Sequence, residues 1–225
     1  MSPDERKAIR RDLVLDAGVD LLASGGPQAV TMRGVCRAAR LTERYFYESF
    51  DSRDEFLLAI FEDTVLDARR VVEESLVAHT GLPPAAVIGS VVADLTRHLA
   101  ADPRRGRILF VHSLSNELYP RGRELVSGFT ALITGLFDAV AGAGAVTGTD
   151  PAGRHRTSLA VFGAAAFVYQ DWASRGADPE TREPSDDPRV VAEHLTSAVC
   201  RLLGIGPAGQ ETAGTSTTSS SGSGA

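Results

Sequence analysis

Apolar residues recur along most of this 225-residue chain at intervals of three and four, the spacing that places them on one face of an α-helix. One such run ends at Gly25 and Gly26, and another begins after Ser52. No stretch shows the sustained alternation of apolar and polar residues that a half-buried strand requires. The pattern therefore predicts an all-α fold of nine helices.

Two short helices are expected between these two runs. Thr31 and Thr42 are suitable N-caps, because a threonine hydroxyl can accept a hydrogen bond from a backbone N–H of the first turn. Only residues 39–41 separate the two helices, about the length of turn that a helix-turn-helix uses. In that motif one helix braces the second, which enters the major groove of DNA. The pair therefore predicts a DNA-reading unit.

Proline and capping residues mark the remaining helix starts. Ser52 and Glu55 have the spacing of a capping box, in which each side chain bonds the other residue's backbone N–H. Asp-Pro pairs precede three later helices, because aspartate caps a helix and proline fits its first turn. Beyond residue 80, helices are expected over 84–101, 103–115, 120–141, 151–175 and 188–203.

The segment from Leu41 to Phe50 carries the pattern Leu-Thr-x-x-x-Phe-Tyr-x-x-Phe, and Ser-Arg-x-Glu follows it. With the preceding Gly turn and Thr-capped helix, this order resembles the tetracycline-repressor (TetR) family of bacterial regulators over residues 8–68. One position departs from the family, since Arg40 stands where the turn usually has glycine. Glycine suits a left-handed backbone, so either the turn differs here or Arg40 tolerates that conformation.

The resemblance implies two helical domains with different tasks. Residues 1–52 would form the N-terminal helix-turn-helix domain, and residues 53–205 a ligand-binding and dimerisation domain. The Ser- and Thr-rich tail, residues 206–225, has little apolar surface to bury and is expected to be disordered. A regulator of this family would act as a homodimeric repressor that a small-molecule effector releases from a palindromic double-stranded DNA operator.

The DNA contacts are inferred from position in the family. The hydroxyl groups of Thr31, Thr42 and Tyr47 and the guanidinium of Arg53 would contact phosphates. Arg44 and Tyr45 match positions that face base edges. Arg44 can donate two hydrogen bonds to guanine O6 and N7, and its alternatives are a phosphate contact or an ion pair with Glu48. The full set is Thr31, Arg33, Thr42, Arg44, Tyr45, Tyr47 and Arg53.

The charge distribution changes this picture only slightly. The net charge is −6. Residues up to Arg53 carry nine basic and eight acidic side chains, so the acidic excess lies in the second domain. Attraction to phosphates depends on charges within a Debye length, and arginines cluster around the predicted turn. Modest non-specific DNA binding is therefore expected.

The second half supplies side chains for an effector site and a dimer interface. Aromatic and polar side chains suggest an effector site, although aromatics at helical spacing are more often plain core. The candidates are Phe110, His112, Asn116, Phe167, Gln170 and Trp172. Small residues and an apolar stripe on the last two helices allow a four-helix bundle between subunits, or packing within one subunit. These residues are Gly163, Ala164, Ala165, Ala166, Val191, Leu195, Val199 and Leu202.

Other kinds of chemistry receive little support. Asp94, His98 and Asp102 are four apart, a spacing that can hold a metal but that solvated ion pairing explains better. No nucleophile elbow or phosphate loop is present, so we expect neither an enzyme nor a cofactor. Without a membrane-length apolar span, the chain is expected in the cytoplasm, associated with the nucleoid. The competing interpretations are an enzyme or a protein-binding adaptor on the same scaffold.

Overall fold

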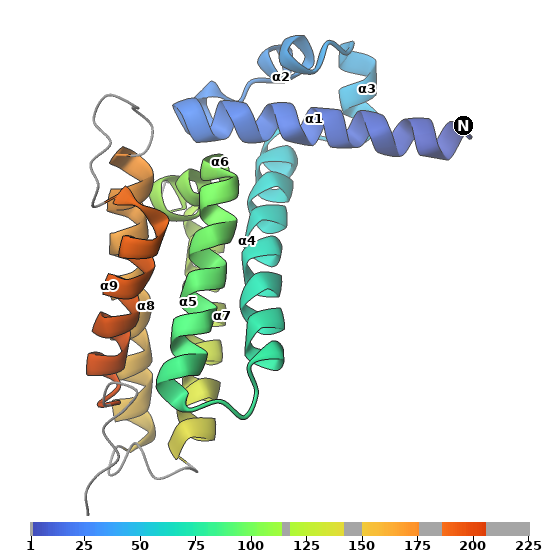
Figure 1. The fold of residues 1–225 in the computed structure, drawn as a ribbon. Coiled ribbons are helices and arrows are strands. Elements are labelled where there is room, and N and C mark those ends of the chain that lie inside the picture. Colours follow the sequence, from blue (N-terminus) through green and yellow to red (C-terminus); the bar gives the residue numbers. More distant parts are fainter. Residues whose placement is uncertain (1, 114–117, 142–149, 176–185, 206–225) are drawn as a thin grey trace, which may run out of the picture.

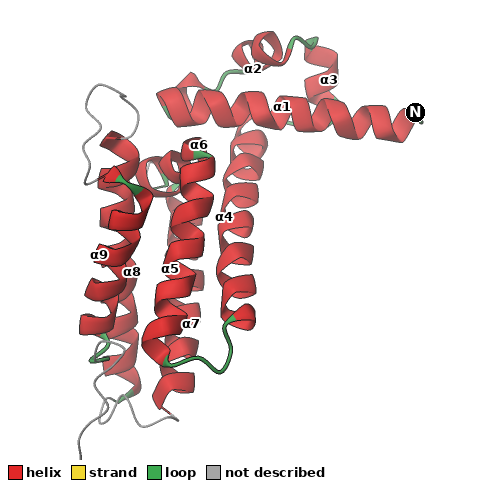
Figure 2. Cartoon of the chain, viewed as in Figure 1, coloured by secondary structure: helices red, strands yellow, loops and turns green. Residues whose placement is uncertain are grey.

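The computed structural model describes residues 2–113, 118–141, 150–175 and 186–205. The described residues are helical and include no strand, which confirms the predicted all-α class (Figure 2). The N-terminal helices are α1 (Pro3–Gly25), α2 (Met32–Ala39), α3 (Glu43–Tyr47) and α4 (Arg53–Ala78), with the 3-10 turn η1 (Pro27–Ala29). The others are α5 (Pro84–Ala101), α6 (Pro103–Arg107), α7 (Tyr119–Ala141), α8 (Pro151–Arg175) and α9 (Pro188–Leu202).

One predicted helix has a different form. The stretch expected as a single helix over 103–115 is the short helix α6 followed by a π-helical turn, η2 (Ile108–His112). Apolar periodicity could not show this, because a π turn accommodates an extra residue without removing the apolar side chains around it. Residues 114–117 lie outside the described residues, as do the predicted tail 206–225 and most of the loops between α7, α8 and α9.

The helices form two layers that cross one another in the view of Figure 1. Helix α1 lies across one end of a bundle made by α5 to α9, and α2 and α3 lie on the outer side of α1. Helix α4 starts beneath α1 and runs along the bundle to its far end. It therefore belongs to both layers and connects them mechanically.

Close packing joins α1 to the start of α4. Gly18 on α1 has no side chain, and a Cβ atom there would lie 2.4 Å from Phe56 Cζ and 2.6 Å from Ile60 Cδ1. Phe56 is fully buried and contacts two rings of the reading unit, Phe46 at 5.1 Å and Phe50 at 4.8 Å between centroids. Phe46 and Phe50 are the residues expected to anchor the second short helix, and both are buried.

At the turn between α2 and α3, the structure shows how the chain accommodates Arg40. Its backbone takes the left-handed conformation, with φ 55° and ψ 39°, and it is the only non-glycine residue with positive φ in the described ranges. Arginine thus adopts the conformation for which glycine is better suited. The helix-turn-helix geometry is kept, and the turn carries some backbone strain.

The helix caps are mostly as the sequence predicted. Ser52 Oγ accepts a hydrogen bond from the Glu55 N–H at 3.1 Å, which is half of the expected capping box. The Glu55 carboxylate accepts instead from the Asp51 N–H at 2.7 Å, one residue before the cap. Within the described ranges, no helix is long and apolar enough to cross a membrane.

Candidate DNA-binding surface and ligand cavity

Helix α3 is held from two sides, which fixes the orientation of its outer face. On one side its phenylalanines pack on α4, as described above. On the other side Arg10 of α1 donates to the Glu48 carboxylate at 3.3 Å and lies 4.5 Å above the centroid of the Tyr45 ring. Tyr45 is therefore half-buried against α1, and less of it is available to a base than the sequence suggested.

The other predicted DNA-contacting side chains on α2 and α3 lie at the surface. Arg33 and Arg44 are exposed, and Tyr47 is 53% exposed. Thr31 Oγ1 accepts from the Gly34 N–H at 3.1 Å, so its own O–H remains able to donate. Thr42 occupies the N-cap position of α3, but its side chain makes no capping hydrogen bond.

Both exposed arginines face glutamates. Arg44 Nε lies 3.3 Å from a Glu48 carboxylate oxygen, and Arg33 Nε lies 3.7 Å from Glu43. The ion pair considered for Arg44 from the sequence is thus formed in the structure. Such exposed pairs contribute about 0–1 kcal/mol, so either arginine can exchange its carboxylate for a phosphate or a base at little cost.

Arg53 has a different position from the one its family role suggests. Its Nε donates to the Val30 carbonyl at 2.8 Å, its Nη2 to the Pro27 carbonyl at 2.5 Å, and its Nη1 to Asp54 at 3.2 Å. These bonds engage all three nitrogens of the guanidinium. Arg53 therefore ties the start of α4 to the connection before α2, and these bonds help to orient α2 and α3.

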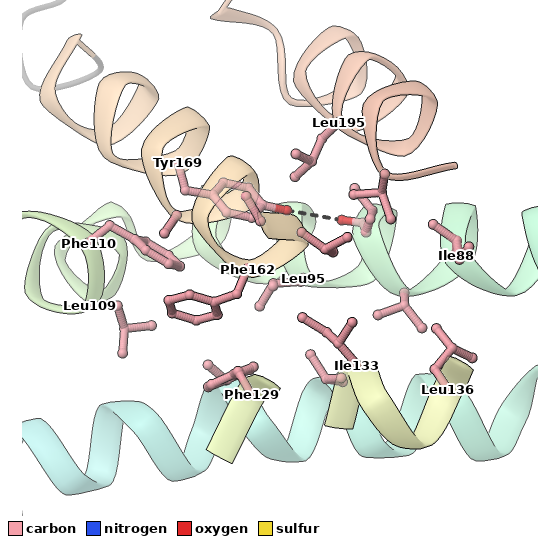
Figure 3. Close-up of a pocket in the computed structure, with 18 of the residues that line it drawn as sticks. Ile88, Leu95, Leu109, Phe110, Phe129, Ile133, Leu136, Phe162, Tyr169 and Leu195 are labelled. Atoms are coloured by element: carbon pink, nitrogen blue, oxygen red, sulfur yellow. Dashed lines mark hydrogen bonds between the residues drawn. The ribbon is translucent and has the colours of Figure 1, made fainter. Parts of the chain in front are cut away.

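The bundle contains an apolar cavity of about 130 Å³. Its wall is formed by α4, α5, α7, α8, α9 and η2, and Figure 3 shows rings at one end and branched aliphatic side chains at the other. All the described lining side chains are apolar except that of Tyr169. The labelled lining residues are Ile88, Leu95, Leu109, Phe110, Phe129, Ile133, Leu136, Phe162, Tyr169 and Leu195.

The hydroxyl of Tyr169 is already satisfied within the protein. It shares a 2.7 Å hydrogen bond with Thr96 Oγ1 and donates to the Val92 carbonyl at 3.5 Å, the dashed line in Figure 3. Burial raises the pKa of Tyr169 above its usual value, so the phenol stays neutral. The cavity wall therefore offers neither a charge nor an unused hydroxyl to a ligand.

The predicted effector residues are distributed differently from what we expected. Phe110 lines the cavity, and its ring stacks on Tyr169 at 5.3 Å. Phe167 points away from it and is 72% exposed, while Trp172 is buried and donates to the Asp186 carbonyl at 2.9 Å. Gln170 is not part of the cavity wall, and Asn116 lies outside the described residues.

His112, the remaining candidate, lies at the junction between the two layers instead of in the cavity. Its Nε2 is 3.4 Å from the Ala23 carbonyl, and its ring faces Gly26, at the end of α1. Burial lowers the pKa of His112, which keeps the ring neutral at neutral pH. Leu109 and Phe110, on the same π turn, line the cavity, so this turn contacts both the cavity and α1.

The stripe predicted for the dimer interface mostly faces inward. Val191, Leu195 and Val199 are buried in the core of their own subunit, and two of them line the cavity together with Ala165 and Ala166. Their spacing of four and three marks a buried face of α9, and periodicity alone could not tell which partner covers it. Leu202 is exposed, Ala164 is half-buried, and a Cβ at Gly163 would meet no atom within 4 Å.

Ion pairs cross the junction between the layers. Arg104 of α6 donates to Asp16 and Asp20 of α1 at 3.0 Å and 2.7 Å. The neighbouring Arg105 lies 3.2 Å from Asp67 of α4. Helix α6 is thus bound by charge to both helices that carry the reading unit.

The aspartates and histidine weighed as a metal site belong to this ion-pair system. Asp102 accepts from Arg104 at 2.8 Å, His98 lies 3.0 Å from Asp67, and Asp94 accepts from Arg97. Hydrogen bonds from Arg104 lower the pKa of Asp102. In the described part of the chain, no group of three His, Cys, Asp or Glu side chains is arranged to hold a metal ion.

Residues 14–60 match the family of bacterial regulatory proteins of the tetR type. This segment, which contains α2, α3 and the turn between them, is of the TetR type. The matched segment lies within the residues that carried the resemblance, and that interpretation is confirmed. No functionally curated protein matches the sequence significantly.

Solved structures of TetR-type regulators share the whole fold. The fatty acid degradation regulator FadR of Bacillus halodurans is 16% identical, with a TM-score of 0.70 over 85% of this chain and 93% of its own. FadR of Bacillus subtilis, solved with stearoyl-CoA, is also 16% identical, with a TM-score of 0.69 over 87% of this chain and 100% of its own. A TetR-like regulator of Rhodococcus sp. RHA1 is 16% identical, with a TM-score of 0.67 over 86% of this chain and 95% of its own. At this identity the likeness establishes the fold.

Apart from Phe110, the cavity lining was not identified from the sequence as a ligand site. Ile88, Ile133 and Leu136 have the same residue types and helical spacing as ordinary core residues. A cavity differs from a core only in the volume left between side chains, which a single sequence does not encode in any local signal.

Proposed function

We propose that this chain is a homodimeric transcriptional repressor of the cytoplasm that releases its operator when a long apolar ligand fills the bundle cavity. Residues 1–52 would read DNA, residues 53–205 would bind the ligand and the second subunit, and the activity would be binding without catalysis. The observation that carries the ligand class is the uncharged wall of the cavity, whose one hydroxyl group is bonded internally. The stearoyl-CoA complex of the Bacillus subtilis relative supports a long-chain ligand.

Operator reading rests on the outer face of α2 and α3. Tyr47 and Thr31 would donate to phosphates, and Arg44 would leave Glu48 to contact a base edge or a phosphate. Arg33 would add phosphate attraction, while the DNA-contact roles expected for Tyr45 and Arg53 become supporting ones. Binding should weaken steeply as salt rises, because phosphate contacts release counterions.

Dimerisation is proposed through the exposed faces of α8 and α9. Leu159, Gly163 and Phe167 are four apart on α8, and Val190 and Leu202 are exposed on α9. A single exposed apolar residue needs no explanation, but a Phe and two Leu beside an open glycine form a surface that another helix can cover. The two helices and their symmetry mates would make a four-helix bundle.

The π turn η2 would pass the ligand signal to the DNA-binding domain. A ligand that displaces Phe110 also moves His112, since both lie on this five-residue turn. His112 contacts the end of α1, which carries the turn leading to α2. A ligand acts on the operator only through different affinities for the two arrangements, and coupling of about 1–3 kcal/mol is usual.

The test is selection of bound genomic fragments by the full chain at low salt. We expect an enriched palindrome whose half-sites lie about 34 Å apart, the spacing that a two-fold dimer requires. Tyr47→Phe should weaken binding to all sequences, whereas Arg44→Ala should also relax the preference at one base position if Arg44 reads a base. Recovery of no enriched palindrome would overturn the regulator proposal.

A further inference from the structure

Two surface grooves open into the gap between α4 and α7 and share wall residues with the cavity. The first shares Leu125 and Phe129 with it, and the second shares Leu136. The two grooves also share Arg69 of α4 and Gly128 of α7 with each other. Together we call them the α4–α7 groove, which lies beside the cavity.

The α7 side of this groove has room for a ligand. Gly128 and Gly135 line it seven residues apart, and a Cβ atom at either would meet no atom within 4 Å. On the α4 side, Leu66 is exposed at the groove although it is a large apolar side chain. The groove therefore offers an apolar surface with free space beside α7, and it meets the cavity at the shared side chains Leu125, Phe129 and Leu136.

Charged side chains line the solvent-exposed α4–α7 groove. Arg69 lines both halves of the groove, and Arg121 faces the first half from α7. Arg69 donates to Glu73 at 2.7 Å. Arg121 donates to Glu124 at 2.6 Å and lies 3.3 Å from Glu62, and both of these glutamates line the groove. Such half-exposed pairs between neighbouring helical turns are weak, so a ligand carboxylate or phosphate can replace the glutamate.

We propose that the α4–α7 groove is the mouth of the cavity and that Arg69, assisted by Arg121, binds the anionic head of a long-chain ligand. The ligand class is then an amphiphile with an alkyl tail and a carboxylate or phosphate head. The inference rests on the proposed ligand-binding function. It follows from the separation of chemistry in the structure, since the cavity wall has no charge among its described residues, whereas the groove holds Arg69 and Arg121 together with Glu62 and Glu124, the carboxylates that a ligand head would displace from Arg121.

The test compares dodecanoate, dodecyl phosphate and dodecanol in calorimetric titrations of the full chain at slightly alkaline pH. Arg69→Gln is the test variant. Arg70→Gln is its control, because Arg70 is adjacent on α4 but pairs with Asp67 and Glu74 and lines neither groove. We expect Arg69→Gln to weaken the two anions about two- to fivefold, the range for one exposed ion pair, and to leave dodecanol unchanged.

The outcomes separate the head-group site from the cavity. If dodecanol binds the wild type but Arg69→Gln changes the affinity for neither anion, ligand binding in the cavity is supported and the proposed head-group site is overturned. If Arg69→Gln weakens dodecanol as much as the anions, Arg69 has only a structural role and the proposal is also overturned. If neither anion nor alcohol binds the wild type, the proposed ligand-binding function fails first. Selective loss of one anion identifies the head as carboxylate or phosphate.

Discussion

Arg104 Nη1 lies 2.7 Å from Asp20 Oδ1 and thereby links α6 of the helical bundle to α1. The same nitrogen lies 3.0 Å from Asp16, and its side chain is held by Asp102 at the start of α6. One guanidinium therefore connects the two domains beside the turn that lines the cavity.

We predict that Arg104→Gln reduces the coupling between ligand and operator. The variant removes the charge that joins α6 to α1, so movement of α6 would be transmitted less completely. Stability should fall by about 1 kcal/mol, because the pair is partly exposed. The measurement is dodecanoate affinity with and without operator, and the ratio should approach one. Arg97→Gln, an exposed pair on α5, is the control and should keep the wild-type ratio.

Stability should also depend on pH in the acid range. Hydrogen bonds from Arg104 lower the pKa of Asp102 below the usual 3.8, so its stabilising contribution is complete above that value. The contribution is lost as pH falls through the lower, folded-state pKa. Burial acts to raise the pKa of Asp67, but the hydrogen bond from Arg70 and the nearby charge of Arg105 outweigh it. The pKa of Asp67 is therefore lowered too, and its contribution to stability has the same dependence on pH.

The check is urea unfolding between neutral pH and pH below 3.8. Asp102→Asn keeps a capping side chain but cannot titrate, so its stability should decline less on acidification than that of the wild type. Parallel declines for the two proteins would show that Asp102 contributes nothing to acid sensitivity.

Replacing Arg40 by glycine should stabilise the DNA-binding domain. A left-handed backbone costs a non-glycine residue about 1–2 kcal/mol, and replacement by glycine removes that cost. The greater freedom of glycine in the unfolded chain lowers the stability by about 0.5–1 kcal/mol and so offsets part of the gain. A net gain of up to about 1 kcal/mol is expected in thermal unfolding. Arg37→Gly, within α2 at ordinary helical angles, should instead destabilise the protein. A lower melting temperature for Arg40→Gly would contradict the strain assigned to this turn.

Filling the cavity should abolish ligand binding without unfolding the protein. Ala165→Met places a flexible side chain in the cavity, where it replaces empty space, so stability should stay within about 1 kcal/mol of wild type. Dodecanol should no longer bind, and operator affinity should persist. Ala164→Met, one residue away and not part of the cavity wall, should bind dodecanol normally.

Local signals predicted most helix limits correctly. Pro84, Pro103, Pro151 and Pro188 each begin a helix at the predicted residue, because proline fixes the first-turn backbone wherever the rest of the chain lies. Arg53 shows the limit of such signals. Its carbonyl partners are about 25 residues away in sequence and approach only once α1 and α4 have packed.

Long-range packing also decided which apolar faces point inward. Leu195 could face a partner subunit or its own core with the same spacing, and the structure places it in the core. Phe167, in an equally apolar stretch of α8, is exposed. The choice between these faces depends on helix orientation, which no local pattern of this sequence contains.

The unbroken length of α4 has a mechanical consequence for operator spacing. Its 26 residues include no proline or glycine and rise about 1.5 Å each, so the helix behaves as a stiff lever about 39 Å long. A tilt of about 5° pivoted at its far end moves the Arg53 end by about 3 Å, and with it the connection to which Arg53 is bonded. In a two-fold dimer the opposite displacements add, so the two recognition helices would shift by about 6 Å against a fixed DNA repeat of about 34 Å. A rotation too small to disturb the bundle core is then enough to put the two recognition helices out of phase with the DNA.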